Sequence, residues 1–60
     1  MTFKKMRKIA SQGGFQFEKS SSRLSSYSFI LRRQGDERHY VDLAQAEPDI
    51  DEIREGGSPL

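Results

Sequence analysis

The hydrophobic pattern of this chain changes its period at Gly13-Gly14, and this change constrains the fold more than any other feature. Before the glycines, apolar residues recur at helical spacing and cover about one third of a helix circumference: Phe3, Met6, Ile9 and Ala10. After them, residues 15–19 alternate apolar and polar side chains, as a half-buried strand does. We therefore predict a helix over residues 2–12, with Thr2 as its N-cap and a left-handed Gly13 at its end, followed directly by a strand.

Two strand-forming segments, residues 27–33 and 38–43, predict a β-hairpin. Loops of two or four residues are disfavoured, because we expect them to place Arg33 opposite Arg38, a pair of like charges. We predict instead a three-residue loop over residues 35–37.

This register assigns a face to every hairpin residue. It sets Leu31 opposite Val41 and Phe29 opposite Leu43, so that one apolar face meets the N-terminal helix. That face is expected to carry Tyr27, Phe29, Leu31, Val41 and Leu43. The reverse face is expected to carry Ser28, Ile30, Arg32, Tyr40 and Asp42, with Arg32 opposite the Tyr40 ring.

The last part of the chain predicts a short acidic helix. Pro48 suits its first position, carboxylates follow in its first turn, and Gly56-Gly57 ends it. The fold class is therefore α+β, with the N-terminal amphipathic helix packed on a small three-stranded antiparallel sheet and this helix at the end. Residues 1–55 form one domain and residues 56–60 a flexible tail. The expected core is Phe3, Met6, Ile9, Ala10, Phe15, Phe17, Phe29, Leu31, Val41 and Leu43, with Ile50 or Ile53 closing an edge.

The chain is short for an independent domain, with sixty residues, one third of them apolar, and no tryptophan. At this size it buries roughly 60% of its unfolded surface, so we expect a thin core and a stability of about 3–5 kcal/mol. A partner or a homodimer would add contact area. Cysteine is absent and histidine occurs once, which excludes disulfides and thiolate metal sites. We expect neither a metal nor a cofactor.

The N-terminus has the basic start of a signal peptide but not its apolar segment. Residues 9–14 are Ile-Ala-Ser-Gln-Gly-Gly, where a signal peptide needs at least about seven apolar residues. No segment approaches the length of a membrane-spanning helix. We therefore expect a soluble, cytoplasmic protein without membrane contacts.

Charge is divided between the two halves of the chain. Residues 1–33 carry eight lysines and arginines and one glutamate, so their balance is 8 − 1 = +7. Residues 34–60 carry two arginines and eight carboxylates, so their balance is 2 − 8 = −6. A surface of one sign attracts partners of the opposite sign, so this division is the best indication of a binding function.

Two binding functions follow from this division. The first is a non-catalytic protein that contacts the phosphates of RNA or duplex nucleic acid through a basic helix and sheet surface, comprising Lys4, Lys5, Lys8, Lys19, Arg23, Arg32 and Arg33. The second is a protein-binding regulator or inhibitor of the phage or mobile-element type. It would use the outer sheet face and the acidic segment, through Ile30, Arg32, Tyr40, Glu47, Asp51 and Glu52.

No motif predicts catalysis. His39 is interpreted as a solvated residue at a strand end, because the predicted hairpin brings it no nucleophile. Residues 20–26 hold serines without a nucleophile motif, so a linker is favoured over a phosphate contact or a phosphorylation site at Ser25 or Ser26. The carboxylates after Pro48 lack the spacing of a calcium loop. We expect the protein not to be an enzyme.

A short helix, a Gly14-Phe15 step, three strands and a final helix follow one another in this chain. This order, over residues 6–43, resembles the small HicA-type toxins, which cleave messenger RNA and have a fold similar to double-stranded-RNA-binding domains. In those toxins a histidine follows a glycine-serine pair after the first strand, whereas residues 20–26 contain none and His39 lies in another strand. The resemblance implies RNA or duplex contact without the nuclease histidine.

Overall fold

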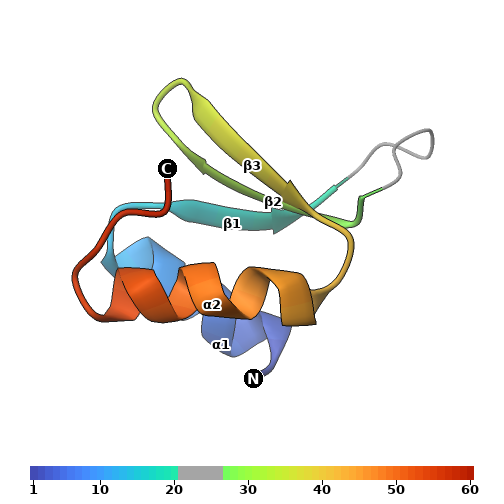
Figure 1. Cartoon of the computed structure of the whole chain (residues 1–60), viewed down its shortest axis with the longest axis horizontal. Helices are drawn as coiled ribbons and strands as arrows, with labels where there is room; N and C mark the ends of the chain where they lie inside the picture. The colour runs from blue at the N-terminus through green and yellow to red at the C-terminus, as the bar shows by residue number, and fades with distance from the viewer. Residues whose placement is uncertain (21–26) are drawn as a thin grey trace.

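The computed structural model describes residues 1–20 and 27–60 and shows two helices on one side of a three-stranded sheet (Figure 1). The elements are α1 (Phe3–Gln12), β1 (Gln16–Lys19), β2 (Phe29–Arg33), β3 (Asp36–Tyr40) and α2 (Leu43–Arg54). The sheet is antiparallel with the order β1-β2-β3. α1 packs on β1 and on α2, and α2 also contacts β3. The predicted α+β class and the packing of the N-terminal helix on the sheet are confirmed.

The N-cap and the last residue of α1 agree with the sequence prediction, and only the left-handed residue after the helix differs. Thr2 is the N-cap, and its Oγ1 accepts a hydrogen bond from the Lys5 N–H at 3.2 Å. Gly13 has a φ of −88°, so the left-handed conformation predicted there is wrong, and Gly14 adopts it with a φ of +85°. Gly13 is needed for another reason, because a Cβ at this position would clash with Ile53 of α2.

The hairpin loop is Gln34-Gly35, one residue shorter than predicted. The two-residue loop does not bring Arg33 opposite Arg38, as the sequence argument assumed, but places it opposite Asp36. Residues of opposite charge are therefore paired next to the turn, which favours this register. Gln34 adopts a left-handed φ of 55° to make the turn.

This register reverses the faces that the sequence predicts for the third strand. Tyr40 pairs with Phe29 and is buried in the core at 5% exposure, whereas Val41, predicted to be buried, is 53% exposed. Arg32 lies opposite Glu37 and not opposite Tyr40. The buried aromatic ring comes from the last residue of the strand.

The helix α2 begins at Leu43, five residues before Pro48, which lies inside it. Asp42 is the N-cap, and its Oδ1 accepts a hydrogen bond from the Gln45 N–H at 2.9 Å. The Gln45 Oε1 in turn accepts one from the Val41 N–H at 3.0 Å. These two bonds satisfy backbone donors at the helix start and explain the early beginning.

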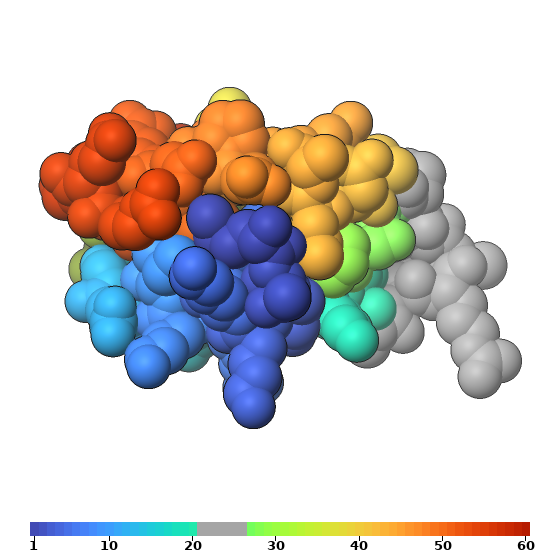
Figure 2. Space-filling model, turned by 90° about the horizontal axis from the view of Figure 1, so that it is seen from below, coloured from blue at the N-terminus to red at the C-terminus, as the bar shows by residue number. Residues whose placement is uncertain are grey.

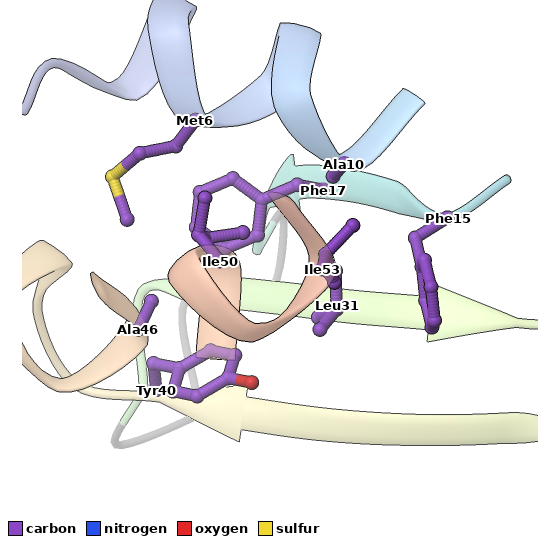
Figure 3. Close-up of a cluster of buried hydrophobic side chains, with 9 residues drawn as sticks. All are labelled: Met6, Ala10, Phe15, Phe17, Leu31, Tyr40, Ala46, Ile50 and Ile53. Atoms are coloured by element: carbon purple, nitrogen blue, oxygen red, sulfur yellow. The ribbon is translucent and has the colours of Figure 1, made fainter. Parts of the chain in front are cut away.

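The core lies between the helices and the sheet (Figure 3). The buried residues are Met6, Ala10, Phe15, Phe17, Leu31, Tyr40, Ala46, Ile50 and Ile53. Four predicted members are only partly buried and pack against this cluster, as does Leu60: Phe3, Ile9, Phe29 and Leu43. At the centre, Phe17 is 5.4 Å from the Phe3 ring, 5.9 Å from Phe29 and 6.3 Å from Tyr40, measured between centroids.

The last residues contact the hairpin. The Arg33 guanidinium donates to the Ser58 hydroxyl at 3.0 Å, and Arg38 donates to the Pro59 carbonyl at 3.4 Å. Leu60 packs against the core. Residues 58–60 are thus held by β2 and β3, in the part of the chain that we predict to be a tail.

Candidate nucleic-acid interface

The outward surface of α1 carries four cations in five residues: Lys4, Lys5, Arg7 and Lys8. Figure 2 looks onto the helix layer and shows α1 in blue alongside α2 in orange. All four side chains are exposed. Within residues 1–20 and 27–60, none of them has a carboxylate within ion-pair distance. Their charge is therefore available to an anionic ligand.

Asp49 and Asp51 of α2 form ion pairs with residues outside α1. Asp49 pairs with Arg38 of β3 at 3.2 Å and accepts a hydrogen bond from the Tyr40 hydroxyl. Asp51 pairs with Arg54, one turn along the same helix, at 2.8 Å. The acidic helix thus lies next to α1 without forming an ion pair with it in the described structure.

The two flanks of α1 face different neighbours. Ile9 and Gln12 line a hollow with Ile53 of α2, while Arg7 and Ser11 line another with β1. Arg7 therefore lies on the flank away from α2.

Helix geometry gives the directions in which the other α1 cations point. At 100° per residue, Lys4 lies about 60° and Lys8 about 100° around the helix from Arg7. Arg7, Lys4 and Lys8 consequently occupy the outward side and the β1 flank, whereas Lys5, about 160° from Arg7, lies toward the α2 flank.

One further predicted residue lies next to this surface. Lys19, at the end of β1, places its Nζ 5.3 Å from the centroid of the Phe3 ring. This cation–π contact brings Lys19 to the first turn of α1. It extends the positive charge from α1 onto the edge of the sheet.

The predicted arginines lie elsewhere. The Arg33 guanidinium is 4.4 Å from the Phe15 ring and holds Ser58, at the opposite end of β1 from Lys19. Arg32 lies on the outer sheet face, away from the helices, between Gln16 and Glu37 on the flanking strands. Arg23 lies outside the described residues. The structure therefore places Lys4, Lys5 and Lys8 on α1 and Lys19 beside the first turn of this helix, and it places Arg32 and Arg33 away from them.

The outer sheet face has no helix over it in the described structure (Figure 1). Ile30 is half-buried there and lies opposite His39. The His39 ring stacks on Tyr27 with 4.0 Å between centroids, and its Nε2 is 3.1 Å from a Glu37 carboxylate oxygen. The Nε of Arg32 is buried without a hydrogen-bond partner in the described residues.

The residues predicted for protein binding are divided between the two layers. Ile30 and Arg32 are on the outer face, but Tyr40 is in the core. Glu47, Asp51 and Glu52 belong to α2, on the other side of the sheet, where the first two are half-buried and Glu52 is exposed. They do not form one surface.

The polar cluster at Tyr40 is not predicted from the sequence, which places this residue on the outer sheet face. Burial, together with the hydrogen bond and charge of Asp49, raises the pKa of the Tyr40 hydroxyl well above its ordinary value of 10.0. The Asp-x-x-Gln pattern at residues 42–45 is a capping signal that could have placed the start of α2 and so the end of β3.

Other kinds of site have no support in the part of the chain that the structure describes. No group of three or more histidines and carboxylates there could hold a metal ion. Within the described residues, neither α1 nor α2 is long and apolar enough to cross a bilayer. No protein-family model matches this chain, and neither a curated protein nor a solved structure matches it.

Proposed function

We propose that this protein is a non-catalytic module that binds nucleic-acid phosphates through α1. The observation that carries the proposal is the set of exposed cations on this helix, none of which is paired with a carboxylate in the described structure. Lys4, Lys5 and Lys8 would contact phosphates directly, and Lys19 would extend the contact at the β1 end. Such contacts position a backbone and give little sequence preference.

The order of the elements supports the same proposal. The order α1-β1-β2-β3-α2 is the order that the resemblance to the HicA-type toxins implies. A helix that lies along a phosphate backbone can present several lysines at once, because residues three and four apart share a face. Lys4 and Lys8 have this spacing.

The test is fluorescence anisotropy with a labelled RNA duplex and a labelled single strand, between 50 and 200 mM salt. On a duplex, each phosphate contact changes the slope of log K against log salt by about −0.9. Three to four contacts therefore predict a slope of about −3. Lys8→Gln should lower the slope by about 1. Arg54→Gln removes one exposed cation from α2 and is the control with the same change in net charge.

The two variants distinguish phosphate contacts made by α1 from a general attraction by net charge. Equal effects of Lys8→Gln and Arg54→Gln would show that only net charge matters, and absence of binding at 50 mM salt would refute the proposal. The alternative, a protein-binding regulator, has less support. Its predicted anchor Tyr40 is buried, and its acidic residues lie on the opposite side of the sheet from Ile30.

A further inference from the structure

The outer edge of β1 is unpaired by any strand in the described structure, because β1 is the first strand in the order β1-β2-β3. The Ser20 N–H donates to the Ser28 carbonyl at 2.8 Å. Ser20 and Ser28 are therefore a hydrogen-bonded pair of the two antiparallel strands. In an antiparallel pair, bonded and non-bonded residues alternate, so Glu18 and Gln16 bond β2. The backbone N–H and C=O groups of Phe17 and Lys19 therefore point to the open edge.

A groove runs beside this edge, between β1 and α1. Its walls include Arg7 and Ser11 from the helix and Phe15, Phe17 and Glu18 from the strand side. Phe15 and Phe17 are buried at its floor, whereas the Arg7 side chain is exposed without a carboxylate partner in the described residues. The groove thus combines the backbone donors and acceptors of the β1 edge with a positive charge.

The opposite edge of the sheet is different. β3 presents Asp36, Glu37, Arg38 and His39 in succession, and charged residues of this kind protect an edge from strand addition. Arg38 is further engaged by Asp49 and by the Pro59 carbonyl. β1 is therefore the edge more open to another strand.

We propose that β1 is a docking edge for an extended acidic segment of a partner protein, which adds as a fourth strand beside Phe17 and Lys19. Partner residues that bond these two positions would direct their side chains to the helix side of the sheet, because side chains of paired residues share a face. There they would meet Arg7 and Lys19. The residue between them would face Glu18 on the outer side of the sheet, so the recognised pattern is acidic, basic, acidic.

This inference does not rest on the nucleic-acid proposal, since it uses Arg7 and the backbone of β1 and shares only Lys19 with that proposal. The probe is a blocked nonapeptide, Thr-Val-Thr-Glu-Lys-Glu-Thr-Val-Thr, added to the full chain. Its control exchanges the first Glu with Lys, which keeps composition and charge but places the two glutamates on opposite faces of the strand. Binding and amide hydrogen exchange are followed by NMR.

The alternating peptide should slow exchange at the Phe17 and Lys19 amides by about tenfold at saturation, because their N–H groups become bonded. Arg7→Gln should weaken this binding by about threefold, the usual effect of one partly exposed ion pair, whereas Arg54→Gln should leave it unchanged. Circular dichroism checks that both variants remain folded.

Three results would overturn the proposal. They are equal binding of the two peptides, equal effects of the two arginine variants, and protection at Glu37 and His39 in place of β1. Sedimentation of the protein alone tests a fourth outcome. A dimer in which the Phe17 and Lys19 amides are already protected would assign the edge to a second copy of this chain and refute a peptide partner.

Discussion

Tyr40→Phe removes a single hydroxyl from the core and tests the polar cluster that links β3 to α2. Tyr40 is 5% exposed, and its hydroxyl donates to the Asp49 carboxylate at 2.5 Å. Hydrogen bonds to charged groups contribute about 1.5–3 kcal/mol. Asp49 keeps its contact with Arg38 in the variant, so we expect the lower value, a loss of about 1.5 kcal/mol at pH 7.

The same substitution should also remove a decrease of the unfolding free energy at alkaline pH. Burial and the hydrogen bond with Asp49 raise the pKa of Tyr40 in the folded protein above its ordinary value of 10.0. A pKa raised by folding gives stability that is present below pH 10.0 and is lost as the pH rises through the folded pKa. From pH 9 to 11 the loss is about 1.3 kcal/mol, because only the unfolded chain ionises freely there. Phenylalanine at this position has no such loss.

The measurement is urea unfolding followed by circular dichroism, for both proteins at pH 7, 9 and 11. We expect the difference in unfolding free energy to fall from about 1.5 kcal/mol at pH 7 to near zero at pH 11. All other ionisable groups are the same in the two proteins, so their effects cancel in the difference. A difference that stays constant from pH 9 to 11 would refute the reasoning, since Tyr40 would then ionise as readily folded as unfolded.

Three further substitutions test the packing at Gly13 and the N-cap of α2. Gly13→Ala should destabilise the protein by about 1–3 kcal/mol, because the added Cβ clashes with Ile53, whereas Gly35→Ala meets no atom within 4 Å and should change the urea midpoint little. Asp42→Ala removes the N-cap of α2 and should cost about 1 kcal/mol with a loss of helical ellipticity. Retention of full stability by Asp42→Ala would mean that Gln45 alone holds the helix start.

The order of the elements could be predicted from the sequence because each depends on local periodicity. The apolar spacing of α1 and the alternation after Gly14 are repeated within a few residues, so tertiary context does not change them. The register between β2 and β3 depends on the length of the loop that joins them. Placing the loop at residues 35–37 instead of Gln34-Gly35 moved Tyr40 to the wrong face.

The start of α2 was missed for a related reason. Pro48 is a good first residue of a helix, so the sequence predicts a helix that begins there and a strand that extends to Leu43. Asp42 and Gln45 supply a stronger start by satisfying the backbone donors. The cap and the hairpin register are coupled, because a strand that ends at Tyr40 leaves Asp42 free to cap the helix.

The charge division of the sequence becomes a division between two adjacent helices. Packed helices lie about 8–10 Å apart, and the Debye length at 0.15 M salt is about 8 Å. A phosphate held at Lys4 and Lys8, on the side of α1 away from α2, is therefore screened from most of the carboxylates of α2 at physiological salt. At about 0.01 M salt the Debye length is about 30 Å, and both helices then act on the ligand together. The net charge of +1 therefore governs only the long-range attraction of the whole protein for a polyanion. Binding at short range depends on the unpaired cations of α1.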